Sequence, residues 1–111
     1  MGGLYERATG AEPFNAAQRF VDAESRINKN VVYDFVSTND IIGGNSGSPV
    51  INANGEVIGA AFDGNIHSLG VSFGYDPELN RTVTVSTAAI TEALRNVYNQ
   101  PRLLRELGVR R

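Results

Sequence analysis

The chain has 111 residues, which is enough for one small domain with a modest core. Its formal net charge is −2, so the charge balance points neither to nucleic acid nor to an anionic membrane as a partner. With no cysteine and one histidine, the sequence excludes a disulfide framework and a thiolate or histidine-rich metal site, and we expect no cofactor. No apolar run reaches the length of a membrane span, and no signal peptide is visible.

Residues 1–30 are expected to form a helical lead-in segment. A turn of helix is expected at residues 4–9, and Asn15 is a favoured N-cap for a second helix. The apolar residues that follow have helical spacing and predict a stripe facing a core: Ala16, Phe20, Ala23 and Ile27. Because the chain starts abruptly, with two glycines after Met1, we expect the natural protein to extend upstream.

Residues 31–86 have the pattern of strands. The segments 31–37, 49–52 and 56–62 are rich in β-branched and aromatic residues. Asn54-Gly55 predicts a hairpin between the last two, because this pair tolerates the positive φ of a tight turn. Gly59 makes the returning strand thin, which favours either a substrate lying against it or the close packing of another strand.

Two further strands are expected at residues 71–75 and 81–85, with a turn at residues 76–80 between them. Residues 87–111 predict helices packed on the sheet, the first capped by Ser86 or Thr87. Pro101 begins the last helix and Gly108 ends it. The sequence therefore predicts a mainly β fold of five or six antiparallel strands, with an N-terminal helix and a C-terminal helix.

The stretch from Gly43 to Val50 has the residues that acyl transfer needs. A serine between small residues on a tight turn exposes its Oγ, and the neighbouring N–H groups of Gly44 and Ser46 are free to converge on one point. These parts would be a nucleophile, Ser46, and an oxyanion hole. Gly/Ser/Asn clusters are, however, more often ordinary turns, and Ser48 departs from the G-x-S-x-G elbow of the α/β-hydrolases.

The order of strand, Gly-Gly-Asn-Ser-Gly-Ser-Pro-Val, strand, Asn-Gly turn and strand resembles the nucleophile region of chymotrypsin-fold serine peptidases. Asn45 stands where many secreted members carry an Asp that pairs with a newly cut N-terminus, so we infer a site without that switch. In this fold the catalytic His and Asp precede the Ser. No histidine precedes Ser46, and His67 is expected to be a rim residue rather than the base. Either the base lies on an N-terminal barrel outside this chain, so that the chain alone is inactive, or the chain is not catalytic.

A closer resemblance extends over nearly the whole chain. It rests on Leu4–Arg7, Asn39–Val50, Phe62–Asn65, Tyr75–Arg81 and Leu103–Leu107. These blocks are similar to the C-terminal part of the bacterial dipeptidyl-peptidase 7 and dipeptidyl-peptidase 11 family. The resemblance implies the second β-barrel of a chymotrypsin-like serine exopeptidase that releases dipeptides from free peptide N-termini. It also implies a homodimer in the periplasm or at the surface of a Gram-negative bacterium, with His and Asp far upstream.

The same resemblance implies two substrate-binding residues. Asp63 matches an aspartate that holds the substrate's terminal ammonium. Gly64 matches the P1 position, where arginine accompanies acidic residues and glycine leaves room for bulky hydrophobic ones, so we expect a hydrophobic P1 preference. A competing count from trypsin-like enzymes places Asp40 at the base of the pocket and predicts Lys or Arg at P1. The alternatives are an endopeptidase of the same fold and a non-catalytic peptide-binding fragment.

Overall fold

The structure is a computed structural model that describes residues 1–109. The chain divides into two compact units, which are described separately. The sheet unit is Tyr33–Thr87, and the helical unit is Met1–Val32 together with the segment that starts at Ala88. None of the helices in the described part has the length and apolar character needed to span a bilayer. The expected packing of the C-terminal helices on the sheet stays a prediction.

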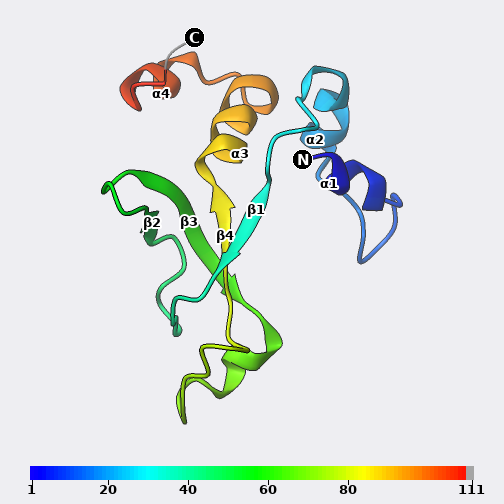
Figure 1. The fold of residues 1–111 in the computed structure, drawn as a ribbon. Helices are drawn as coiled ribbons and strands as arrows, with labels where there is room; N and C mark the ends of the chain where they lie inside the picture. The colour runs from blue at the N-terminus through cyan, green and yellow to red at the C-terminus, as the bar shows by residue number, and fades with distance from the viewer. Residues whose placement is uncertain (110–111) are drawn as a thin grey trace. The chain divides into compact units, whose positions relative to one another are not determined.

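The sheet unit contains one antiparallel four-stranded sheet in the order β1-β4-β3-β2 (Figure 1). Its strands are β1 (Asp34–Ser37), β2 (Pro49–Ile51), β3 (Val57–Gly64) and β4 (Thr82–Ser86). The prediction of a mainly β, antiparallel fold is confirmed. The prediction of five or six strands is wrong for the described residues, which form four.

The small residues of β3 are explained by close packing. A Cβ added to Gly59 would lie 2.4 Å from Cγ2 of Thr84 and 3.1 Å from the ring of Phe35. These contacts come from β4 and β1. Gly59 pairs with Ser86, two residues from Thr84, and Phe35 pairs with Thr84, so the three contacting residues lie on the same face of the sheet. Close packing, rather than a bound substrate, therefore accounts for the thin strand at this position.

The hairpin between β2 and β3 is confirmed. The N–H of Gly55 donates to the carbonyl of Asn52 at 3.0 Å, and Gly55 has a φ of 79°. Oδ1 of Asn52 also accepts the N–H groups of Asn54 at 2.9 Å and Glu56 at 3.0 Å. The side chain of Asn52 thus satisfies the backbone donors of the turn.

The connection from β3 to β4 differs from the expected one. Ile66–Gly70 forms a 3₁₀ helix where a loop was expected. Residues 71–75 do not form the predicted strand; their backbone bonds are those of a turn, such as Phe73 N–H to the carbonyl of Gly70 at 2.9 Å. The turn at residues 76–80 is confirmed, since the N–H of Asn80 donates to the carbonyl of Asp76 at 2.8 Å.

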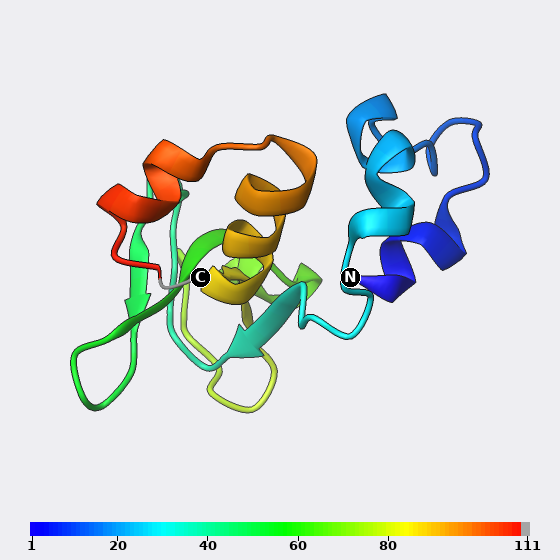
Figure 2. The same ribbon diagram turned by 90° about the horizontal axis from the view of Figure 1, so that it is seen from above.

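The helical unit contains short helices (Figure 2). They are α1 (Gly2–Arg7), α2 (Gln18–Ala23), a 3₁₀ helix (Glu24–Arg26), α3 (Thr87–Glu92), a π-helix (Ala93–Val97) and α4 (Pro101–Glu106). The start of α3 and the start of α4 agree with the prediction. Gly108, with a φ of 69°, follows α4 as expected.

The prediction of Asn15 as a helix cap is wrong. α2 begins after Ala17, which makes no side-chain capping bond. The N–H of Phe14 donates to the carbonyl of Ala11, and the N–H of Thr9 donates to that of Phe14, so local turn bonds hold this segment outside the helix. The predicted apolar stripe is present only in part: Ala23 and Ile27 are buried and Phe20 is half-buried, but Ala16 and Ile27 lie outside α2.

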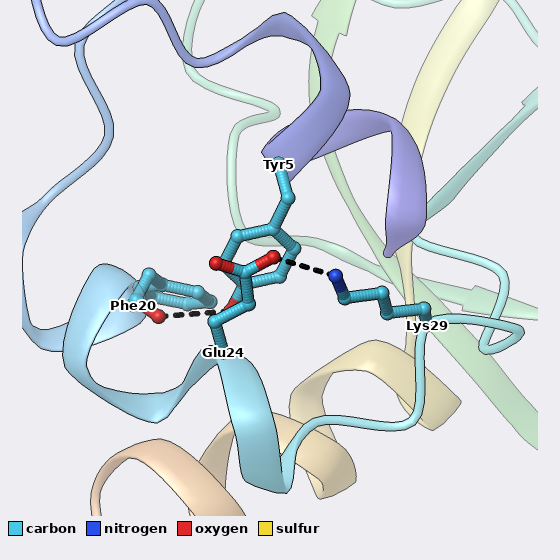
Figure 3. Close-up of polar contacts among 4 residues, drawn as sticks. All are labelled: Tyr5, Phe20, Glu24 and Lys29. Carbon is cyan, nitrogen blue, oxygen red and sulfur yellow. Dashed lines mark hydrogen bonds and ion pairs between the residues drawn. The ribbon is translucent and has the colours of Figure 1, made fainter.

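Polar side chains tie the helical unit together. Oη of Tyr5 donates to the carbonyl of Phe20 at 2.9 Å, and Lys29 pairs with Glu24 at 2.5 Å (Figure 3). The Lys29 ammonium lies 5.2 Å from the centre of the Tyr5 ring. Burial and the Glu24 charge raise the pKa of Tyr5, and the Lys29 charge opposes them.

Candidate active site

The loop that carries Ser46 consists of two turns that share one residue, Asn45. The N–H of Asn45 donates to the carbonyl of Ile42 at 3.2 Å, and the carbonyl of Asn45 accepts the N–H of Ser48 at 3.0 Å. The third residue of each turn is a glycine with positive φ, Gly44 at 98° and Gly47 at 89°. Turns of this type need glycine there, so the spacing of the glycines is dictated by the backbone.

Asn45 also fixes the loop with its side chain. Its Oδ1 accepts the N–H of Ile42 at 2.8 Å, which closes the first turn a second time. Two hydrogen bonds join the second turn to β3. The N–H of Gly47 donates to the carbonyl of Ala61 at 2.7 Å, and the N–H of Ala61 donates to the carbonyl of Ser48 at 3.0 Å. The nucleophile candidate therefore sits on a loop held at both turns.

Ser46 lies at the exposed corner of this loop. Its Oγ is 3.4 Å from the carbonyl oxygen of Phe62, a long hydrogen bond that leaves the hydroxyl accessible. Within residues 1–109, the backbone N–H groups of Gly44 and Ser46 have no acceptor. The two donors named from the sequence are thus unpaired next to an exposed hydroxyl.

A bulge in β3 brings the other candidate residues to this loop. Ala61 pairs with Thr84 and Asp63 with Val83, so Phe62 is an extra residue in β3. Bulges bend a strand and re-aim its side chains. The carboxylate of Asp63 is exposed; its Oδ1 accepts the N–H of Gly64 at 2.8 Å, and its Oδ2 has no partner in the described part of the chain.

Ser46, Asp63 and Gly64 line one hollow of about 340 Å³, called here the Ser46 hollow. Its walls are partly apolar, through residues of the loop and of the β3–β4 connection: Ile41, Ile42, Phe62, Leu69 and Val71. Gly44 is not part of the lining, but both of its neighbours are. A carboxylate and a serine hydroxyl therefore face the same space, at one end of β3.

Two residues weighed from the sequence do not reach this space. Asp40 lines a separate hollow of about 290 Å³, to which Ser46 does not contribute, and this argues against Asp40 as the base of a P1 pocket. His67 is exposed on the 3₁₀ helix and does not line the Ser46 hollow. Residues 1–109 contain no group of three or more potential metal ligands.

The role of Asn65 was not predicted from the sequence. Its Nδ2 donates to the carbonyl of Leu79 at 2.7 Å, and its Oδ1 accepts the N–H of Arg81 at 3.1 Å. Its own N–H donates to the carbonyl of Arg81 at 2.9 Å. Asn65 thereby joins the wall of the Ser46 hollow to the turn before β4. The Phe-Asp-Gly-Asn block was the available signal, but periodicity does not reveal a side chain that bonds to backbone.

Proteins similar in sequence to this chain are named as peptidases. The chain is 44% identical over 75 residues to a dipeptidyl-peptidase 7 from Porphyromonas endodontalis, covering 68% of this chain and 9% of that protein. It is 29% identical over 139 aligned positions to an Asp/Glu-specific dipeptidyl-peptidase from Shewanella putrefaciens, covering 98% of this chain and 19% of that protein. The chain thus spans at most about a fifth of the length of these curated relatives.

Solved structures of dipeptidyl peptidases and the profile of a peptidase family also match this chain. A crystal structure of DPP11 from Porphyromonas endodontalis matches with a TM-score of 0.84 at 22% identity, covering 100% of this chain and 18% of that one. A second, with a TM-score of 0.85 at 23% identity, contains the dipeptide Arg-Glu and covers 97% of this chain and 17% of that one. These matches establish the fold. The profile of the family Peptidase S46 matches residues 1–109, and the chain therefore belongs to the peptidase S46 family.

Proposed function

We propose that the protein containing this chain is a serine dipeptidyl peptidase, which releases dipeptides from the free N-termini of peptides. One observation carries the proposal: an exposed serine hydroxyl and an exposed carboxylate line the same hollow, beside two unpaired backbone donors. A carboxylate at a fixed distance from the nucleophile would bind the substrate's ammonium and so fix where the peptide is cut.

In this proposal Oγ of Ser46 attacks the carbonyl carbon of the P1 residue. The N–H groups of Gly44 and Ser46 stabilise the negative charge that develops on the carbonyl oxygen. A base must accept the proton of Oγ and give it to the leaving amine as the C–N bond breaks; water then attacks the acyl-enzyme, which frees the dipeptide and restores the serine. His67 lies outside the lining of the Ser46 hollow, so we assign the base and its partner carboxylate to an upstream part of the protein.

Asp63 is the proposed anchor of the ammonium. A charge-assisted hydrogen bond from an ammonium to a carboxylate is shorter and stronger than a neutral one. Oδ1 of Asp63 is oriented by the N–H of Gly64, which leaves Oδ2 for the ligand. This feature favours an exopeptidase over an endopeptidase, because a substrate without a free amino group would leave the carboxylate unpaired.

The P1 preference is the finer part of the proposal. A hydrophobic P1 residue fits the apolar walls of the Ser46 hollow. Some relatives carry the name Asp/Glu-specific dipeptidyl-peptidase, which makes acidic P1 residues the competing outcome. Substrates that differ only in Leu or Asp at P1 distinguish the two.

The fold and setting of the whole protein are further proposals. We assign the sheet unit to the second β-barrel of a chymotrypsin-like catalytic domain, and the protein to a homodimer in the periplasm or at the cell surface of a Gram-negative bacterium. The support is the sequence resemblance. Sedimentation of the full-length protein and cell fractionation test these assignments; a monomer, or a protein confined to the cytoplasm, would contradict them.

The decisive experiment compares free and N-acetylated dipeptidyl fluorogenic substrates in the full-length protein. We expect hydrolysis of the free form only, and a loss of about 10⁴-fold or more in kcat for Ser46→Ala. Ser48→Ala is the matched control. It removes another serine hydroxyl from the same loop, one that does not line the Ser46 hollow, and the variant should remain active. Equal cleavage of both substrates would indicate an endopeptidase, and an active Ser46→Ala variant would exclude Ser46 as the nucleophile.

A further inference from the structure

The space beside Gly64 is already occupied by Ser68. A Cβ added to Gly64 would lie 2.9 Å from Cβ of Ser68 and 3.1 Å from its Oγ. Side-chain carbons do not approach one another this closely without displacement. Any residue larger than glycine at position 64 therefore requires Ser68 to move.

Hydrogen bonds from its backbone and side chain fix the position of Ser68. Its N–H donates to the carbonyl of Asn65 at 2.9 Å, within the 3₁₀ helix Ile66–Gly70. Its Oγ lies 3.0 Å from Oδ1 of Asn65 and 3.3 Å from the carbonyl oxygen of Arg81. Asn65 is in turn fixed to the turn before β4 through Leu79 and Arg81.

The close atom is also the one that cannot rotate away. Cβ of Ser68 is attached directly to the backbone, so relieving the contact requires a shift of the 3₁₀ helix rather than a change of rotamer. Gly64 and Ser68 both line the Ser46 hollow, together with Asp63. The two residues thus form one wall of the proposed substrate site.

We propose that Ser68 is a second specificity-determining residue, and that the pair of residues at positions 64 and 68 sets which P1 side chains the hollow accepts. This inference rests on the proposed dipeptidyl peptidase activity. It implies that a side chain at position 64 requires a smaller residue at position 68. It also implies that removing the side chain of Ser68 enlarges the hollow while Gly64 is unchanged.

The test is a set of variants in the full-length protein: Gly64→Arg, Ser68→Gly, Ser68→Ala, and Gly64→Arg combined with each Ser68 variant. Ser68→Ala removes the hydroxyl but keeps Cβ, whereas Ser68→Gly removes both, so the two separate the hydrogen bonds from the steric contact. The measurements are the thermal unfolding midpoint and kcat/KM for free-amino substrates with Ala, Leu, Phe or Asp at P1.

We expect Ser68→Gly to raise the Phe-to-Ala ratio of kcat/KM by roughly 10-fold, the effect of added volume in an apolar pocket, and Ser68→Ala to change it much less. Gly64→Arg alone should lower the unfolding midpoint and reduce activity on every substrate. Ser68→Gly, but not Ser68→Ala, should restore the midpoint in the double variant and allow cleavage after Asp.

Two results would overturn the inference while the proposed function stands. One is an unchanged Phe-to-Ala ratio in Ser68→Gly; the other is a Gly64→Arg variant that is as stable and as active after Asp as the double variant. A wild-type protein that cleaves none of the free-amino substrates would instead overturn the proposed function, and this inference with it.

Discussion

A buried carboxylate of the helical unit and the exposed groups of the candidate site in the sheet unit differ in how they are paired. In the helical unit, Glu92 is only 7% exposed, and its Oε1 accepts the N–H of Asn28 at 2.7 Å and Nδ2 of Asn96 at 2.8 Å. In the sheet unit, the N–H groups of Gly44 and Ser46 and Oδ2 of Asp63 have no partner within the described residues. Buried polar groups are normally paired, so the unpaired groups at an accessible hollow are those available to a ligand.

We expect this difference to separate residues that stabilise the fold from residues that act in the proposed site. Changing a paired group such as Glu92 should alter the free energy of unfolding. Changing an exposed group with a free acceptor, such as Oδ2 of Asp63, should alter substrate binding and leave stability nearly unchanged. This expectation would be wrong if a change at Glu92 altered substrate binding alone, or if a change at Asp63 altered stability alone.

Between Asp63 and Glu92, the larger effect is expected for Asp63→Asn, which removes the charge but keeps the shape. We expect kcat/KM for free-amino substrates to fall by about 100-fold, because a hydrogen bond to a charged group contributes about 1.5–3 kcal/mol. Cleavage of any N-acetylated substrate should not fall. Asp40→Asn is the matched control, an exposed aspartate that lines the other hollow. A loss of stability in Asp63→Asn, without a loss of activity, would make Asp63 a structural residue.

The next effect is expected for Glu92→Ala in the helical unit. The variant leaves two donors, on Asn28 and Asn96, without their acceptor, and we expect the free energy of unfolding to fall by about 2 kcal/mol. Glu92→Gln keeps an acceptor oxygen and should lose less. Glu106→Ala, which breaks an exposed ion pair with Arg102, should change stability by under about 0.5 kcal/mol in urea unfolding. Equal losses for Glu92→Ala and Glu106→Ala would show that burial is not what matters.

The smallest effect is a pH dependence at Tyr5. Its pKa is raised in the folded chain, so folding holds the phenol proton more tightly than the unfolded chain does. The resulting stabilisation is complete below the ordinary pKa of about 10 and is lost as the pH rises through the folded-state pKa. Tyr5→Phe should cost about 1 kcal/mol at about pH 8, through the bond to Phe20, and flatten the alkaline loss. Parallel stability curves for the two proteins up to about pH 11 would contradict this.

Local chemistry predicted the turns and helix ends of this chain well. Asn54-Gly55, Pro101 and Gly108 act through backbone angles that depend on few neighbours. The strand expected at residues 71–75 failed because strand propensity depends on a partner strand. The N–H groups of Val71, Phe73 and Gly74 instead donate to the nearby carbonyls of Ser68 and Gly70.

The candidate site was predicted in its residues but not in its geometry. The sequence named Ser46, Gly44, Asp63 and Gly64, and three of them line one hollow; their chemical roles stay predictions. Alternation along β3 gives the wrong face for Asp63, because the extra residue Phe62 shifts the period. The contact between Gly64 and Ser68 depends on how the 3₁₀ helix folds back, which no periodicity encodes.

The short strand after the nucleophile loop has a consequence for how a peptide can bind. β2 is an edge strand of three residues, it begins with Pro49, and its register shifts between Val50 and Ile51. A proline without an N–H, short length and irregular pairing are the features that keep a sheet edge from adding another strand. This edge is therefore protected against aggregation. In the proposed function, we expect an extended substrate to find its main-chain hydrogen bonds elsewhere around the Ser46 loop.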